Sequence, residues 1–406
     1  MRISYDNGKT FETIYDHTDL TNETTTAWTA WYPGTVALTQ ANPDMILTSR
    51  NGITVSYDHG QSFKLKNSGI SGAMIYDFVF DDKGQINYVG MLDFGISKRV
   101  DGYEGDFPPM EIVNSYPTMD GGAKSVTSIA VDPNDKNHII GTTGSGWVYG
   151  HISYLVESYD NLNTFGIYSD MRQHLNDLKT ETGKVRGPRR IKYSSTDSDV
   201  IYASWFVSED RGKKWRETTV MVSDISPFDG DVAYGFDEGS ELMVSYDRAR
   251  TWKGTGMKFS GYRELVADIH EPYVVYIPIH GYSRVYKVDL KTGSMELWNE
   301  ENGFWITKEN GEKYHPTIGF QMRNFSQDPK NPSHMVICGN DFFASANYLF
   351  ESYDGGKSWK WIEGLPGGCG ISHLEFHPTE PRVYIGSSQG AYVYYYEKYG
   401  IQEDNQ

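Results

Sequence analysis

The sequence predicts an all-β fold in which antiparallel strands are joined by short turns. The chain combines 14% aromatic residues with 42 glycines, a motif of eight residues recurs along it, and turns rich in proline, aspartate and asparagine separate its apolar segments. Aromatic and β-branched residues favour strands, whereas glycine, proline and asparagine favour turns. No segment approaches the roughly 18 consecutive apolar residues of a membrane span, so no membrane insertion is expected.

The recurring motif reads Ser-x-Asp-x-Gly-x-Thr/Ser-Trp/Phe. Strong copies begin at Ser4, Ser56 and Ser352, and degraded copies begin at Ser158, Ser208 and Ser245. In each copy the aspartate can accept hydrogen bonds from the backbone of the turn, and the glycine permits a positive φ. An apolar strand precedes the copies and the aromatic residue starts the next strand. Each copy is therefore predicted to be a β-hairpin turn that stabilises the fold, and its aspartate is given no catalytic role.

A second repeat consists of turns that lie between two apolar strands and precede the motif. These turns fall at Asn42–Pro43, Asp81–Asp82, Asp132–Asn134, Thr196–Asp197, Pro227–Asp229, Glu271–Pro272, Asp328–Pro329 and Pro378–Pro381. Together the two repeats predict eight units of four strands, two of which, near Lys98 and Lys287, have lost the motif.

Repeated four-stranded units at this spacing are typical of a β-propeller, which we predict as one domain over residues 1–406. The last unit supplies three strands and the chain then ends. We expect a strand at Phe11–Tyr15 to complete that blade and close the ring. Eight blades are predicted, with seven as the alternative if the termini pair differently.

These motifs resemble the Asp-box, or BNR, family of β-propellers. The Asp328-Pro-Lys-Asn-Pro332 turn followed by Ser352-Tyr-Asp-Gly-Gly-Lys-Ser-Trp359 is most similar to the xyloglucanase-type glycoside hydrolases of family 74. Sortilin-type receptors and sialidases share the box. The resemblance implies a secreted or periplasmic protein. The N-terminus has no basic-then-apolar signal segment, which also leaves a cytoplasmic location open.

The net charge and the absence of certain motifs limit the classes of binding partner and cofactor that we expect. The 37 basic and 54 acidic residues give a net charge of −17, which argues against nucleic acid and anionic membrane surfaces as partners. Two cysteines are too few for a disulfide scaffold or a multi-cysteine metal cluster. No metal, nucleotide or nucleophile motif is present. We therefore expect no cofactor other than an optional structural calcium ion, and a monomer.

The resemblance to family 74 implies a pair of catalytic aspartates in loops that join the second and third strands of a blade. Two positions match this placement: Asp93 in Gly90-Met-Leu-Asp-Phe-Gly95, and Asp341 in Gly339-Asn-Asp-Phe-Phe343. Glycosidic hydrolysis requires two carboxyl groups, one protonated and one ionised. The first hypothesis is therefore a glycoside hydrolase that cleaves a polysaccharide or oligosaccharide with Asp93 and Asp341.

Aromatic residues gather in the loops expected on the same face. Apolar ring faces suit the C–H faces of sugars, whereas packing between neighbouring loops is the alternative use of these residues. The candidate sugar-binding residues are Trp28, Trp31, Trp147, Trp205, Trp305 and Phe342.

Two other functions stay open at this level. A polysaccharide lyase acting on a uronate-containing glycan needs a histidine or tyrosine base and an arginine that neutralises the carboxylate. The candidates are His151, Tyr149, His280, Tyr282, and Arg189 or its neighbour Arg190. A noncatalytic propeller that binds a glycan or a protein is the other alternative.

Overall fold

The computed structural model resolves the chain into two compact units, Met1–Ala73 and Met74–Gln406. Among the residues that the structure describes, no helix is long and apolar enough to cross a membrane. The described residues are 2–4, 6, 8–13, 35–39, 42–49, 53–60, 64–65, 75–91, 95–100, 110–113, 125–143, 154–167, 188, 190–261, 265–279, 284–307, 311–314, 317–318, 325–341, 346–365, 371–387 and 390–396.

The first unit holds a hairpin and one sheet. The hairpin pairs β1 (Arg2–Ile3) with β2 (Glu12–Thr13). The sheet has the order β3 (Thr35–Thr39), β4 (Asn42–Ser49), β5 (Ile53–Ser56) and β6 (Lys64–Leu65). Residues 12–13 of the predicted closing strand thus pair with β1, and closure of a ring by Phe11–Tyr15 stays a prediction.

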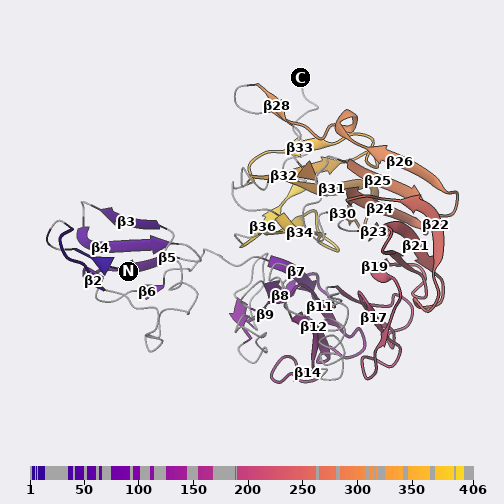
Figure 1. Ribbon diagram of the computed structural model, residues 1–406, viewed down its shortest axis with the longest axis horizontal. Helices are drawn as coiled ribbons and strands as arrows, with labels where there is room; N and C mark the ends of the chain where they lie inside the picture. The colour runs from indigo at the N-terminus through magenta and orange to yellow at the C-terminus, as the bar shows by residue number, and fades with distance from the viewer. Residues whose placement is uncertain are drawn as a thin grey trace. The chain divides into compact units, whose positions relative to one another are not determined.

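The second unit begins with four sheets, each of four antiparallel strands in chain order (Figure 1). The first holds β7 (Ile75–Phe80), β8 (Ile86–Met91), β9 (Gly95–Arg99) and β10 (Met110–Ile112). The second holds β11 (Ile129–Val131), β12 (Ile139–Thr143), β13 (Tyr154–Ser158) and β14 (Gly166–Ile167). The third holds β15 (Ile191–Tyr193), β16 (Ile201–Ala203), β17 (Phe206–Ser208) and β18 (Arg216–Glu217). The fourth holds β19 (Met221–Ile225), β20 (Ala233–Phe236), β21 (Glu241–Ser245) and β22 (Lys253–Lys258).

Three further sheets complete the second unit. One holds β23 (Val266–Ala267), β24 (Val274–Ile279), β25 (Arg284–Asp289) and β26 (Ser294–Trp298). The next holds β30 (Phe325–Asp328), β31 (Asn331–Asp341), β32 (Ala346–Ser352) and β33 (Lys360–Ile362), with β29 (Thr317–Ile318) also paired to β31. The last holds β34 (Ile371–Phe376), β35 (Val383–Ser387) and β36 (Gly390–Tyr394). Between β26 and β30 lie the 3₁₀ turn η1 (Glu300–Asn302) and the hairpin of β27 (Ile306–Thr307) and β28 (Lys313–Tyr314).

This strand order confirms the predicted all-β class. Eight of the sheets in the described residues have three or more strands, and the number of blades stays a prediction. Six of the eight predicted turns lie wholly between two consecutive strands of a sheet, and a seventh, Asp328–Pro329, overlaps the last residue of β30. The prediction was wrong at Asn42–Pro43, because these residues belong to β4, where a shift of register at Leu38/Thr39 absorbs the extra backbone. Whether the sheets form one domain stays a prediction.

All six motif copies join two paired antiparallel strands, which confirms that they are hairpin turns. In the last copy the Ser352 hydroxyl donates to Asp354 Oδ1 at 2.9 Å and accepts the Gly356 amide at 2.9 Å. Asp354 also accepts the Ser358 amide at 2.9 Å and its hydroxyl at 2.6 Å. The bond from serine to aspartate recurs in the copies at Ser4, Ser56, Ser158, Ser208 and Ser245.

In the first motif copy these bonds favour the ionised form of the aspartate. In the first copy, hydrogen bonds from Thr10 lower the pKa of Asp6 to about 2. A carboxyl group with so low a pKa carries no proton to donate at neutral pH. The geometry therefore agrees with a stabilising role for the motif aspartates.

The second glycine of the last motif copy lies directly against a side chain of the preceding sheet. Gly356 has φ +88°, and a Cβ built on it would lie 2.2 Å from Cζ2 of the fully buried Trp298. We expect Gly356→Ala to lower the free energy of unfolding by about 1–3 kcal/mol from overpacking, in addition to left-handed backbone strain. Gly355→Ala is the matched control, because Gly355 also has a positive φ but no atom within 4 Å of its Cβ position. Equal losses in urea unfolding would contradict the overpacking.

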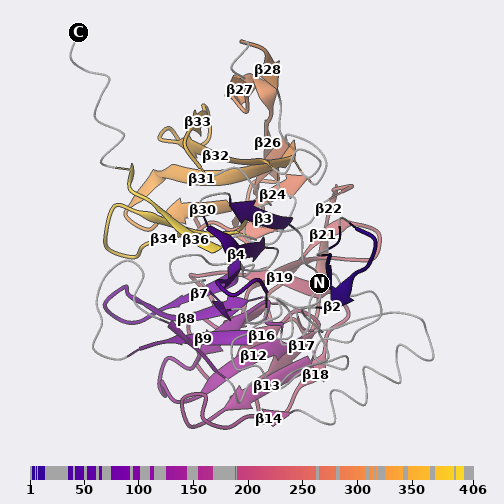
Figure 2. The ribbon, with the colours of Figure 1, turned by 90° about the vertical axis from the view of Figure 1, so that its left-hand side faces the viewer.

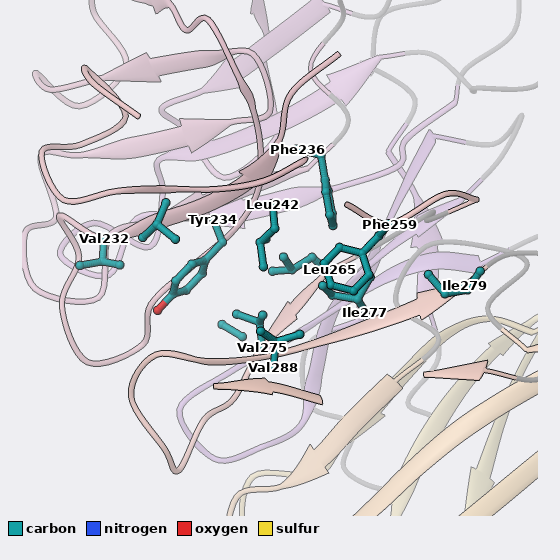
Figure 3. Close-up of a cluster of buried hydrophobic side chains, with 12 residues drawn as sticks. Val232, Tyr234, Phe236, Leu242, Phe259, Leu265, Val275, Ile277, Ile279 and Val288 are labelled. Atoms are coloured by element: carbon teal, nitrogen blue, oxygen red, sulfur yellow. The ribbon is translucent and has the colours of Figure 1, made fainter. Parts of the chain in front are cut away.

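Hydrophobic clusters fill the space between neighbouring sheets. In the cluster of Figure 3, Tyr234 and Phe236 of β20 and Leu242 of β21 pack against Val275 and Ile277 of β24. All five side chains are at most 2% exposed. Packing between neighbouring sheets therefore stabilises the fold, since burial of apolar surface is the main favourable contribution to folding.

Polar side chains connect the first strands of successive sheets. Asp77 accepts the Ile129 amide at 2.7 Å, Ser128 accepts the Ile191 amide at 3.1 Å, Asp224 accepts the Ala267 amide at 3.0 Å, Gln327 accepts the Ile269 amide at 3.0 Å, and Ser326 accepts the Phe376 amide at 3.3 Å. His373 on β34 lies 3.0 Å through its Nδ1 from the carbonyl oxygen of Tyr76 on β7. The last sheet of the second unit thus contacts the first (Figure 2).

Buried histidines form a second kind of polar contact, close to the motif turns. His138 is 1% exposed, and its Nδ1 lies 3.2 Å from Asp132 Oδ2 while its Nε2 lies 3.7 Å from Glu157 Oε2. The Tyr159 ring stacks on the imidazole with centroids 4.3 Å apart. The same arrangement recurs around His334. Burial alone would lower the pKa of His138, but the two carboxylates outweigh it and raise that pKa.

This raised pKa predicts a pH-dependent contribution to stability. A histidine whose folded-state pKa exceeds its unfolded value of about 6.5 stabilises the fold fully below that value, and the contribution is lost as pH rises through the folded-state pKa. We expect the difference in unfolding free energy between the wild type and His138→Gln to be largest near pH 6 and to shrink above it. Urea unfolding at several pH values measures this, and a difference that grows with pH would contradict the assignment.

Candidate functional site

The strand order divides the connections of each sheet between two ends. The motif turns and the turns between first and second strands lie at one end. The connections between second and third strands, and those that lead to the next sheet, lie at the other, which we call the loop end. Pairs such as Met91 with Gly95 and Asp341 with Ala346 mark the loop end of two sheets in the second unit.

Of the two predicted catalytic residues, Asp341 is the last residue of β31. Its backbone therefore lies at the loop end, as the sequence predicted for a residue between second and third strands. Asp93 falls between β8 (which ends at Met91) and β9 (which begins at Gly95), the same connection in another sheet. It lies outside the described residues, so a catalytic role for the pair stays a prediction.

The other predicted site residues fall mostly in connections at the loop end. Tyr149 and His151 lie between β12 and β13, and His280 and Tyr282 lie between β24 and β25. The candidates outside the described residues are Trp28, Trp31, Asp93, Trp147, Tyr149, His151, Arg189, His280, Tyr282 and Phe342.

The two tryptophans that the structure describes differ in their surroundings. Trp205 lies between β16 and β17, is partly buried, and packs against the hydrophobic cluster that includes Ile191 and Phe206. Trp305 precedes β27 and is also partly buried, and Nζ of Lys313 lies 5.8 Å from its ring centroid. Their role as sugar platforms stays a prediction.

Sequence reasoning missed a charged cluster on the first strands. Nζ of Lys192 on β15 lies 2.5 Å from Oδ1 of Asp224 on β19, whose Oδ2 accepts the Ala267 amide of β23. Arg190 donates from Nη1 to the Ser223 carbonyl at 3.2 Å. Burial would raise the pKa of Asp224, but Lys192 and Arg190 outweigh it and lower that pKa. The alternation of charged and apolar residues in Arg190–Lys192 was the one sequence signal for charged side chains on this strand. No sequence pattern indicated that Asp224 would be the partner of Lys192.

Nothing in the described residues offers a metal centre. No group of three or more histidine, cysteine, aspartate or glutamate residues in that part of the chain is arranged to hold an ion. The expectation of an optional calcium ion rests on the sequence alone.

No family model matches the chain. The chain is 21% identical over 300 residues to an oligoxyloglucan-reducing end-specific xyloglucanase of Emericella nidulans. The match covers 63% of this chain and 36% of that relative. The chain thus spans about a third of that relative's length.

Solved structures of family 74 glycoside hydrolases resemble the fold. The enzyme of Niastella koreensis matches with a TM-score of 0.54 and 17% identity over 79% of this chain and 52% of that one. The xyloglucanase of Xanthomonas campestris matches with a TM-score of 0.55 and 16% identity over 97% of this chain and 55% of that one. This chain spans about half the length of each. The likeness shows an all-β fold of the propeller type.

Proposed function

We propose that this chain is part of a secreted glycoside hydrolase that cleaves glycosidic bonds in a polysaccharide of the xyloglucan type. The similarity to a xyloglucanase in sequence, together with two family 74 structures in fold, carries this proposal. The position of Asp341 at the loop end of β31 supports it, because that is where a catalytic carboxylate was expected.

In the proposed mechanism the carboxyl groups of Asp93 and Asp341 lie on opposite sides of the scissile bond. One is protonated and donates its proton to the leaving oxygen. The other is ionised and takes a proton from the attacking water, so that the glycosidic C–O bond breaks as the new C–O bond forms. A separation of about 6.5–9.5 Å between the carboxyl groups leaves room for this water and predicts inversion at the anomeric carbon.

We further propose that the sheets of the second unit form one ring of seven blades. The contacts of Ser372 and His373 with the carbonyls of Ile75 and Tyr76 support this arrangement, because they connect the last sheet to the first. A closed ring removes the open sheet edges that otherwise favour aggregation. It would bring the loop ends of all seven sheets to one face.

A panel of polysaccharides with two readouts tests the function. New reducing ends on a neutral glucan, without ultraviolet absorbance, are the expected result for a hydrolase. Absorbance from an unsaturated uronate on an acidic polysaccharide would indicate a lyase and move the catalytic assignment to His151, Tyr149, His280, Tyr282 and Arg189. Retained binding with neither product would overturn catalysis in favour of a binding propeller.

A further inference from the structure

The last and the first sheets of the second unit meet where β34 and β35 pack against β7. The rings of Phe80 on β7 and Tyr384 on β35 have centroids 5.1 Å apart. Nδ1 of His373 on β34 lies 3.0 Å from the carbonyl oxygen of Tyr76 on β7. The residue that follows β34 is His377, whose ring centroid is 6.1 Å from that of Phe80. We call this set of contacts the β7–β34 junction.

His377 is buried at this junction and acts as a hydrogen-bond acceptor. It is 2% exposed, and its Nδ1 accepts the amides of Thr379 and Glu380 at 3.1 and 2.8 Å. Because both amides donate, Nδ1 carries a lone pair, and the neutral ring carries its proton on Nε2. Burial lowers the pKa of His377, which favours the neutral form that this turn requires.

The turn that carries His377 is held between two neighbouring sheets. On one side lies Gly84, in the turn between β7 and β8, which has φ +78°. A Cβ built on Gly84 would lie 2.5 Å from Cε1 and 2.7 Å from Nε2 of His377, so a side chain there would displace the imidazole. On the other side, Nζ of Lys330 donates to the carbonyl of Thr379 at 2.5 Å. A change in this turn therefore affects the contacts with both sheets.

The charged groups around His377 do not compensate a buried proton. Glu380 raises the pKa of His377 and Lys330 lowers it, and burial outweighs the effect of Glu380. The Glu380 side chain is 56% exposed and is paired with Arg382 at 3.0 Å. In the turn that holds Gly84, Asp81 is paired with Arg99 at 2.8 Å. The other ionisable groups on the elements packed against the ring are Asp82, Lys83, Asp328, His373, Glu375 and Tyr384.

Equivalent turns in other sheets use an acceptor that does not titrate near neutral pH. Asp268 accepts the amides of His270 and Glu271 at 2.6 and 2.8 Å, in the same way as Nδ1 of His377 accepts two amides. A carboxylate remains an acceptor down to about pH 4, whereas a histidine changes its protonation state between about pH 5 and 8. The aspartates that accept turn amides at this place in other sheets are Asp81, Asp132 and Asp328.

We propose that His377 makes the β7–β34 junction sensitive to acid: a proton taken up at Nδ1 removes the acceptor of both turn amides, and the turn moves away from Gly84. The bond of His373 persists in acid, because the carbonyl of Tyr76 only accepts and Nδ1 of His373 already donates. The junction therefore opens from the turn that follows β34.

The sign of the pH dependence follows from the lowered pKa of His377. The neutral ring stabilises the junction fully above the unfolded-state value of about 6.5. This contribution is lost as pH falls through the lower folded-state pKa. The second unit should therefore be closed at the β7–β34 junction at neutral pH and open there in acid. This inference concerns the fold and does not depend on the proposed hydrolase function.

Hydrogen exchange of the full chain, followed by mass spectrometry at about pH 7.5 and about pH 5, tests the junction. Exchange is measured in peptides that cover the turn after β34 and the turn after β7. After correction for the intrinsic rate, we expect it to rise about tenfold in acid, the net effect of roughly two lost hydrogen bonds. Peptides that cover β20, in a sheet away from the junction, should keep their protection. Equal loss in β20, or no loss at the two turns, overturns the proposal.

Two variants assign the response to a residue. His377→Asn keeps a side-chain acceptor that does not titrate, so its turns should exchange alike at both pH values. His270→Asn is the matched control, because Nε2 of His270 donates to the Asp328 carbonyl at 2.8 Å and keeps that bond when the ring is protonated. It should respond to acid as the wild type does. An acid response that persists in His377→Asn would assign it to another group and overturn the proposal. If His377→Asn fails to fold, the comparison of the turns with β20 in the wild type still decides.

Discussion

Replacing Asp341 by asparagine is expected to reduce the hydrolysis rate of xyloglucan by a factor of 10²–10⁴. A carboxylate that transfers a proton in the transition state contributes about this much, and an amide of the same shape neither donates nor accepts that proton. The backbone of Asp341 is fixed in the pairing with Ala346, so the substitution should leave the strand intact. Release of reducing ends under saturating substrate measures kcat.

Asp93→Asn is expected to cause a loss of similar size if the two residues act as a pair. The double variant should then lose little more than either single variant, because groups that act as a unit contribute in a non-additive way. Asp229→Asn is the control, since Asp229 is an exposed turn residue at the opposite end of its sheet. Full activity in Asp341→Asn would remove this residue from the mechanism, and another carboxyl group would then have to transfer the proton.

Replacing Asp224 by alanine is expected to lower the free energy of unfolding by about 1–3 kcal/mol, mainly because a buried backbone amide loses its acceptor. Asp224 is 3% exposed and joins three sheets, through Lys192 of β15 and the Ala267 amide of β23. Its loss removes the acceptor of the Ala267 amide, whereas the Lys192 side chain is 37% exposed and stays solvated, so the lost ion pair adds little. Urea unfolding followed by tryptophan fluorescence measures the change.

The lowered pKa of Asp224 gives this effect a pH dependence. Its stabilising contribution is fully present above the unfolded-state pKa of about 3.9 and is lost as pH falls through the lower folded-state value. The wild type and Asp224→Ala should therefore converge in stability only in acid. Asp199→Ala provides a comparison, because its side chain is 60% exposed and lies 3.9 Å from Arg211, a geometry worth about 0–1 kcal/mol. If both variants lost a similar free energy of unfolding, the buried contact of Asp224 would contribute no more than an exposed ion pair.

The sequence predicted the parts of the fold that are encoded locally. Ser352, Asp354 and Ser358 lie within six residues of one another, and the motif aspartate bonds groups two and four residues away. Such turns form from their own side chains, so a spacing pattern is sufficient to identify them. The repeated strands are visible for the same reason, because alternation and turn residues are properties of short segments.

Contacts between sheets could not be predicted in this way. Asp224 and Ala267 are 43 residues apart, and Tyr314 meets Tyr348 only because an inserted hairpin folds beside β32. The partner of a buried polar group depends on how neighbouring sheets pack, and the spacing of residues in the sequence does not show this packing. For the site, the sequence placed Asp341 correctly at the end of a second strand. It overlooked the ion pair of Lys192 with Asp224, because these two residues lie far apart in the sequence.

The contact between His373 and Tyr76 also has a consequence for how the protein is made. Its partners are separated by 297 residues of chain. At about 5–20 residues per second, a ribosome needs roughly 15–60 s to synthesise that interval. During this time β7 has left the ribosome, but the sheet that covers it does not yet exist. The edge of β7 therefore stays exposed until the last sheet of the second unit has been synthesised. A chaperone that shields exposed strand edges would act during this interval.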